Sequence, residues 1–409
     1  MRTFVDRLSR HDLRQLVIMR QIGSTVFFTF VCYATIGLPL AVLPSYVHVQ
    51  LGYGEVMAGL SISAQYIATL LSRPLAGRMA DMVGPKQTLL LGLVSCTVSG
   101  LCLLLAASLP DRPVAGLAAI LASRLTVGLG ESWVATSAIA WAIRQVGPRN
   151  MARVISWNGI ATYGALAAGA PIGVALQHSF GFWSIGPTEM ALAALAFPLA
   201  AMKRGSEIIP GRRLPFLDVL WRVLPHGTSL ALGSIGFGTI AAFITLYYTS
   251  RGWTGAALSL TVFGLSFMAA RVLFARSIGR FGGFPVAIAS FTVECAGLLL
   301  LWQSWSAGAA MAGSALAGLG FSLAFPALGV EAVNPIPAHS RGTALGVYSV
   351  FLDVALGISG PLMGLIVSLL GYPSAFLAAA LASVAACALA VGLCVRARPA
   401  IRPADARQD

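Results

Sequence analysis

The chain has 409 residues, of which 57% are hydrophobic and only 10% are charged, and its mean hydropathy is +0.82. Because a water-soluble domain carries about 25% charged residues, this composition excludes a soluble globular fold. The net charge of +13 has the sign expected of a protein that binds nucleic acid. However, the basic residues cluster between apolar segments, so we expect a membrane protein with no nucleic-acid partner.

Apolar segments long enough to cross a bilayer follow one another along the chain. A transmembrane helix needs about 20 mostly apolar residues. The alternating segments of about ten residues that build a transmembrane barrel do not occur. The sequence therefore predicts an all-α membrane protein with twelve transmembrane helices. In chain order the expected spans are 22–43, 56–76, 88–107, 114–138, 154–176, 184–202, 225–248, 256–275, 284–302, 308–333, 343–369 and 374–395.

The longest polar insert lies near the middle of the chain and divides the spans six and six. We expect an N-terminal six-helix half at 1–202, which includes a cytoplasmic segment at 1–20. A cytoplasmic linker at 203–222 joins it to a C-terminal six-helix half at 223–395, and a cytoplasmic tail follows at 396–409.

The Lys and Arg residues predict the orientation. All but three of the 27 lie in segments that share one side of the membrane when the N-terminus is cytoplasmic; the exceptions are Arg112, Arg251 and Arg124. Cytoplasmic loops carry this excess, so both termini are expected in the cytoplasm and the protein in the cytoplasmic (inner) membrane. The N-terminal segment has charges of both signs and no small-residue cleavage site, so a removed signal peptide is not expected.

Neither a metal site nor an enzyme is indicated. The six cysteines lie in apolar segments without Cys-x-x-Cys spacing or a nearby His, so we expect neither disulfides nor metal ligands. No paired carboxylates or nucleophile motif appear, and no cofactor is expected.

The two halves share weak internal repeats. Gly128 and Pro171 have counterparts in Gly318 and Pro361 at the same separation. A weaker match places "SRPLAGRMADMVG" (72–84) on "ARVLFARSIGRFG" (270–282). Parallel repeats of this kind are typical of transporters whose substrate site lies at the repeat interface.

The segment "GRMADMVGPK" (77–86) crowds charged residues into a Gly- and Pro-rich stretch between two apolar spans. It resembles the signature loop between the second and third helices of the major facilitator superfamily, with Met82 and Pro85 as departures. "RLTVGLGES" resembles the fourth-helix motif of the same family, and "YGALAAGAPIG" (163–173) the fifth-helix motif of its proton-driven antiporters. The resemblance implies the major facilitator fold over essentially the whole chain.

The resemblance also implies that this loop is a cytoplasmic latch, in which Asp81 faces the start of the eleventh helix near Gly342 and Thr343. We interpret the loop as a turn of Gly and Pro between two helices. The alternative is that the loop only fixes the orientation of the chain in the membrane. Arg78 and Lys86 would be sufficient for that role, and Asp81 would not contribute to it. The candidate latch residues are Gly77, Arg78, Asp81, Gly84 and Lys86.

Arg124 and Glu131 share the fourth span seven residues apart, which places them on one helix face about 10 Å apart along the axis. Placing a charged side chain in a span costs about 2.5–3.5 kcal/mol on insertion scales, so we expect each such residue to have a structural or functional role. Glu131 can titrate whereas Arg124 cannot, which predicts proton coupling through direct, water-mediated or substrate-mediated pairing. A structural ion pair is the alternative. The pattern also resembles spinster-like efflux branches of the family, although this chain lacks their first-helix acid.

Other acids lie in or near the spans. Asp353 in the eleventh span is either a second titrating site or a polar contact between helices. Glu294 is expected to be protonated between helices, Glu189 to snorkel, and Glu331 to lie at the interface.

Aromatic and hydroxyl residues dominate the helices that line the cavity in this fold. They favour an amphipathic organic solute over an inorganic ion. With Arg124, the candidate lining residues are Tyr33, Thr35, Phe237, Phe243, Tyr247, Phe321 and Phe325.

The leading hypothesis is a monomeric secondary active transporter that exports a small amphipathic compound or drug in exchange for protons. An uptake symporter or uniporter on the same fold is the alternative. A channel would show a filter-like ring or re-entrant loop, and none is visible. A sensor would need a larger soluble insert.

Overall fold

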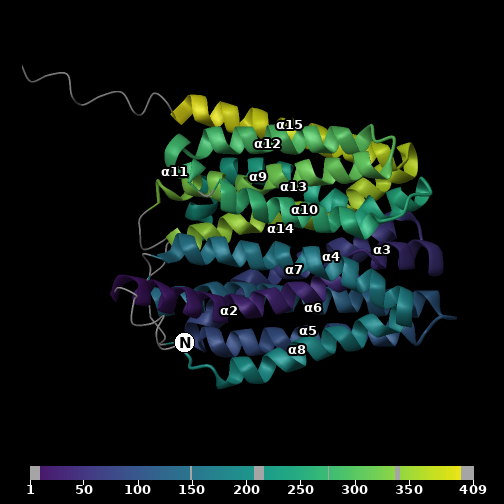
Figure 1. Cartoon of the computed structure of the whole chain (residues 1–409), viewed down its shortest axis with the longest axis horizontal. Coiled ribbons are helices and arrows are strands. Elements are labelled where there is room, and N and C mark those ends of the chain that lie inside the picture. The colour runs from purple at the N-terminus through teal and green to yellow at the C-terminus, as the bar shows by residue number, and fades with distance from the viewer. Residues whose placement is uncertain (1–9, 148–149, 207–215, 275, 337–340, 398–409) are drawn as a thin grey trace, which may run out of the picture. The chain divides into compact units, whose positions relative to one another are not determined.

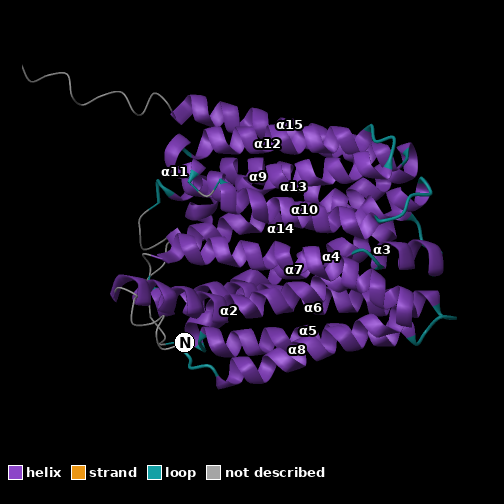
Figure 2. Ribbon diagram, viewed as in Figure 1, coloured by secondary structure: helices purple, strands orange, loops and turns teal. Residues whose placement is uncertain are grey.

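The computed structural model describes residues 10–147, 150–206, 216–274, 276–336 and 341–397. Every regular element in these ranges is helical, and none of them contains a strand (Figure 2). Twelve helices in this part of the chain have 18 residues or more, as the twelve predicted spans require. They are α2 (Arg10–Leu40), α4 (Glu55–Met82), α5 (Pro85–Ala107), α6 (Pro113–Val146), α7 (Met151–Phe180), α8 (Ile185–Met202), α9 (Phe216–Ser250), α10 (Ala256–Leu273), α12 (Gly283–Trp302), α13 (Ala307–Val333), α14 (Arg341–Leu370) and α15 (Tyr372–Ala397).

Short helices connect some of these spans. The short elements are α3 (Leu43–Ser45), the π-helical η1 (Tyr46–Gln50), the 3₁₀-helical η3 (Phe182–Ser184) and α11 (Ser277–Phe281).

Eleven helical segments in the described ranges are long and apolar enough to cross a membrane. The remaining long helix, α4, has 28 residues, which gives a length of about 42 Å. It also carries charges near its end, at Arg73, Arg78 and Asp81.

Two of the differences between predicted and observed boundaries concern connecting segments. The segment 77–86 was expected to be a turn, but α4 continues to Met82 and α5 begins at Pro85. Only Val83 and Gly84 separate the two helices, and Gly84 has a φ of 105°, which glycine adopts without steric cost. The polar insert at 203–222 is also shorter than predicted, because α9 already begins at Phe216. Apolar length predicts the part of a helix within the membrane, whereas helices continue beyond it into polar sequence.

The chain forms two compact units. The first contains residues 1–39 and 71–210, and the second contains residues 40–70 and 211–409. Segment 40–70 follows Pro39 in α2 and ends just before Pro74 in α4. Proline removes an intrahelical hydrogen bond and bends a helix, so the two prolines lie where the chain can pass from one unit to the other.

Small residues bring the helices of the first unit close together. A Cβ atom at Gly173 of α7 would collide with the carbonyl of Leu38 in α2, and one at Gly92 of α5 would lie 3.0 Å from the carbonyl oxygen of Gly130 in α6. Membrane helices associate through such close packing, because lipid is as apolar as the side chains and no hydrophobic effect drives the helices together. In Figure 1, α5 and α8 lie side by side.

The second unit has a continuous apolar core. Its buried residues come from α9, α12, α13, α14 and α15, and include Phe291, Leu328 and Tyr348. Segment 40–70 packs in this unit through glycine as well, because a Cβ atom at Gly364 of α14 would lie 2.8 Å from the Cα of Val56 in α4.

Candidate functional site

Arg124 is completely buried in the first unit, with an exposed fraction of 0%. Its Nη2 lies 3.8 Å from Oε1 of Glu189 on α8 and donates a hydrogen bond of 3.4 Å to Oγ of Ser123. Ser99 on α5 completes the network: its hydroxyl donates to Oε2 of Glu189 at 3.2 Å and lies 2.9 Å from the Ser123 hydroxyl. Three helices therefore share one buried polar network.

Glu189 was expected to snorkel toward the membrane surface, and that expectation is wrong, because its exposed fraction is 0%. Glu189 lies little more than one turn from the start of α8, as the sequence suggested. However, the helix is rotated so that the carboxylate meets Arg124 and Ser99 inside the unit. The sequence shows that Glu189 lies within an apolar segment. Its position along the helix does not show in which direction its side chain points.

Glu131 lies on α6 with an exposed fraction of 3% and accepts a hydrogen bond of 3.0 Å from the Tyr33 hydroxyl on α2. The sequence nominated both residues, but for different roles, and did not predict that they meet. Arg124 therefore has a carboxylate partner other than Glu131. The coupling role of Arg124 and Glu131 stays a prediction.

The remaining intramembrane acids lie in the second unit. Asp353 of α14 is 2% exposed, and its coupling role stays a prediction. Glu294 of α12 is 1% exposed and lies close to α9, where a Cβ atom at Gly236 would be 2.6 Å from its Oε1. Glu331, near the end of α13, accepts a hydrogen bond of 2.8 Å from the backbone N–H of Gly283 and so caps α12.

The candidate latch residues surround the junction between α4 and α5. Oδ1 of Asp81 accepts a hydrogen bond of 3.1 Å from Nη2 of Arg144, near the end of α6. Lys86 donates a hydrogen bond of 2.6 Å to the carbonyl of Ala201 in α8, and Arg78 is exposed. Gly77 has open space beside it. The surroundings of Gly342 and Thr343 lie outside what the structure describes, so the latch stays a prediction.

The candidate cavity residues are mostly packed within their own units. Phe237 stacks on Phe321 with ring centroids 5.9 Å apart, and the Tyr247 hydroxyl lies 2.8 Å from the hydroxyl of Ser304. Besides Arg124, the buried members are Thr35, Phe237, Phe243, Tyr247 and Phe321. Tyr33 and Phe325 are partly exposed.

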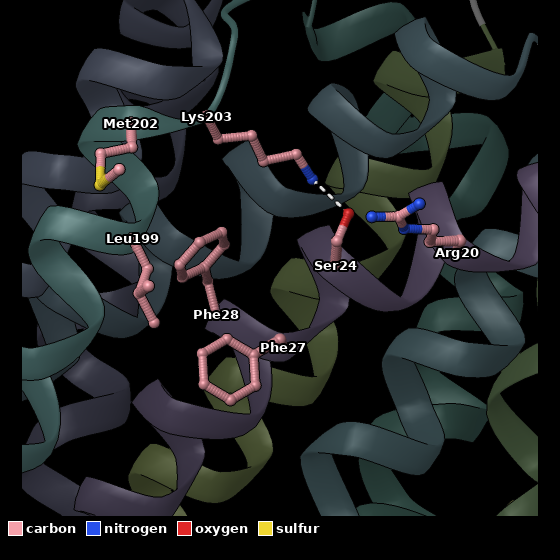
Figure 3. Close-up of a pocket in the computed structure, with 7 residues that line it drawn as sticks. All are labelled: Arg20, Ser24, Phe27, Phe28, Leu199, Met202 and Lys203. Atoms are coloured by element: carbon pink, nitrogen blue, oxygen red, sulfur yellow. Dashed lines mark hydrogen bonds between the residues drawn. The ribbon is translucent and has the colours of Figure 1, made fainter.

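Lys203, just after α8, was not nominated from the sequence. Its ammonium donates hydrogen bonds to the hydroxyls of Ser24 (2.7 Å) and Thr25, and lies 5.1 Å from the centre of the Trp141 ring. Burial lowers the pKa of Lys203 to about 8. Lys203, Arg20 and Ser24 lie at a cavity of about 480 Å³ between α2 and α8 (Figure 3).

Twelve long helices in the described part of the chain, with buried charged residues between them, are typical of a multi-pass membrane protein of the transporter class. The comparisons with known proteins give the family. A sequence profile of the Major Facilitator Superfamily matches residues 25–284 and 227–409. The chain belongs to this superfamily, and the resemblance of its sequence motifs is confirmed.

The relatives cover nearly the whole chain. An uncharacterized MFS-type transporter of Burkholderia mallei is 57% identical over 373 residues, which is 91% of this chain and 92% of that protein. A crystal structure of a mutant of the nucleoside transporter NupG has a TM-score of 0.71 at 16% identity and covers 91% of this chain and 99% of its own. A crystal structure of a D-xylose-proton symporter has a TM-score of 0.72 at 15% identity and covers 90% and 97%. At these identities the two structures establish the fold alone.

Proposed function

We propose that this protein is a proton-coupled exporter of a small amphipathic organic compound, and that Glu131 carries the coupling proton. The observation that carries the proposal is the pairing of Arg124 with Glu189, at 3.8 Å within a fully buried network. In this proposal Glu189 is the counterion of Arg124, so the protonation state of Glu131 can change without leaving Arg124 unneutralised.

Tyr33 supports this role for Glu131. The Tyr33 hydroxyl donates a hydrogen bond to the Glu131 carboxyl group, which can accept it whether or not it carries a proton. Glu131 can therefore exchange its proton during a transport cycle without losing this partner. Tyr33 is partly exposed, whereas Arg124 is not, so the Tyr33–Glu131 pair is the more accessible of the two sites.

The proposed orientation places both termini in the cytoplasm and the protein in the cytoplasmic membrane. It rests on the distribution of Lys and Arg, of which only three lie away from the proposed cytoplasmic side. The proposal also includes two six-helix halves, a latch at Asp81, and a substrate that contacts aromatic residues such as Tyr33.

A proton-driven uptake symporter is the second candidate. It is supported by the fold likeness to a D-xylose-proton symporter. The aromatic character of the candidate substrate residues, among which Arg124 is the single charge, favours an amphipathic substrate and hence export.

The direct test reconstitutes the purified protein in proteoliposomes. Compounds that raise its melting temperature in a metabolite and drug library are first identified. Each is then offered to vesicles under an imposed pH gradient while a pH-sensitive dye reports the vesicle interior. Export by exchange predicts that compound and protons move in opposite directions. Movement in the same direction would establish the symporter instead, and transport without any proton movement would exclude coupling.

A further inference from the structure

A cavity of about 480 Å³ lies within the first unit, between the starting half of α2 and the end of α8. Arg20, Ser24, Phe27 and Phe28 contribute from α2, and their spacing places them on one helix face. The residues from the other wall are Leu199, Met202 and Lys203. None of them belongs to the proposed coupling site or latch.

The cavity is polar at one end and apolar at the other. Arg20, Ser24 and Lys203 gather at the polar end, and in Figure 3 the two cationic groups approach Ser24 from opposite sides. Phe27 follows Arg20 by seven residues, so it lies about 10 Å further along α2. The polar end is the one nearer the start of α2 and the end of α8, where the proposed orientation places the cytoplasmic surface.

The apolar end is open at the surface of the unit. Phe27 is 43% exposed and Leu199 53%. Large apolar side chains exposed on a transmembrane helix are solvated by lipid acyl chains. A ligand of this cavity therefore contacts cations with one end and lies against hydrocarbon with the other.

The cations are suited to an anion. Lys203 contacts two hydroxyl groups and an indole ring, none of which carries a negative charge. Burial disfavours the charged form of Lys203, and an anion beside the ammonium would favour that form. Arg20 adds a second cation one turn before Ser24 on the same helix. Basic pockets between transmembrane helices on the cytoplasmic side bind anionic lipid headgroups.

We propose that this cavity binds one anionic phospholipid of the cytoplasmic leaflet. Arg20 and Lys203 bind the headgroup phosphate, and an acyl chain lies along Phe27 and Leu199. The contiguous apolar wall favours a phospholipid over a free phosphate ion, because a free ion would gain nothing from it.

Native mass spectrometry tests the proposal. The purified full-length protein in detergent is titrated with palmitoyl-oleoyl phosphatidylglycerol, with the zwitterionic phosphatidylcholine of the same acyl chains, and with phosphatidylglycerol plus excess inorganic phosphate. We expect one phosphatidylglycerol to bind before all others, with at least a fivefold preference over phosphatidylcholine. Phosphate should not displace it. Equal binding of the two lipids, or full displacement by phosphate, would overturn the lipid assignment.

Variants place the binding event in the cavity. Arg20→Gln with Lys203→Gln should weaken the first phosphatidylglycerol by about fivefold for each side chain. Arg276→Gln, an exposed cation at the start of α11, is the matched control and should leave the first binding step unchanged. Undiminished binding in the double variant refutes the site. If that variant does not fold, Phe27→Asp keeps both cations and places a negative charge in the apolar wall; normal phosphatidylglycerol binding by Phe27→Asp would refute the site equally.

Discussion

The guanidinium of Arg124 on α6 and the carboxyl group of Glu189 on α8 form an ion pair of 3.8 Å, and both side chains are fully buried. Removing one partner of a buried pair leaves an uncompensated charge and costs about 3–5 kcal/mol. Glu189→Gln should therefore lower the melting temperature of the purified protein markedly, as measured by thermal unfolding in detergent.

A double variant separates charge balance from packing. Because Arg124→Met with Glu189→Met removes both charges, we expect it to recover much of the stability that either single change loses. If the double variant is destabilised by the full sum of the single changes, the two residues do not act as a pair.

The Tyr33–Glu131 hydrogen bond leads to a prediction on coupling. Glu131→Gln mimics the protonated acid, so it should still bind substrate but lose accumulation driven by a pH gradient in proteoliposomes. Tyr33→Phe should retain transport but shift its pH dependence, because the donor to the carboxylate is lost. Glu331→Gln, the same change at the cap of α12, is the control and should transport normally. Uphill transport by Glu131→Gln at the wild-type rate would contradict the assignment and favour Asp353.

The Asp81–Arg144 pair is partly exposed, so its contribution is modest, about 0.2–1 kcal/mol. Asp81→Asn should shift the conformational equilibrium toward the cytoplasm-open state by up to about fivefold. Phe325→Cys, in a background without the six native cysteines, reports this shift as faster labelling from the cytoplasmic side. Arg204→Gln removes an exposed charge just beyond α8 and should leave the rate unchanged. An unaltered rate in Asp81→Asn would leave Asp81 with only a topogenic role.

Lys203 gives the lipid site a predicted pH dependence. Because burial lowers the pKa of Lys203 to about 8, the side chain is charged below that pH and loses its proton above it. Phosphatidylglycerol binding should therefore weaken as the pH rises from about 7 to about 9.5, with a midpoint above about 8 because the bound anion favours the charged lysine. Other charged groups at this end of the unit include Arg20 on α2, Lys86 on α5, Arg144 with its partner Asp81, Arg153 on α7 and Arg204 beyond α8.

Lys203→Arg is the control for this measurement. Arginine stays protonated in proteins, so binding to this variant should be nearly constant over the same pH range. Equal pH dependence in the wild-type protein and Lys203→Arg would show that another group titrates.

The proposed topology is tested with reporter fusions. A reporter inserted at Arg251, in the turn after α9, and one at Arg398, which lies outside the described residues, should report opposite sides of the membrane. Reports from the same side would contradict the proposed orientation.

The sequence alone determined the number of long helices and the family, because the length of an apolar segment and a short motif can both be read locally. Twelve apolar segments predicted twelve helices, and the motif at Asp81 indicated the superfamily that the comparisons confirm. Only the tertiary structure decided which side chains meet. The rotation of α8 brings Glu189 to Arg124, and the packing of α2 against α6 brings Tyr33 to Glu131. Hydropathy gives the depth of a residue in the membrane but not the direction of its side chain, because direction depends on how neighbouring helices pack.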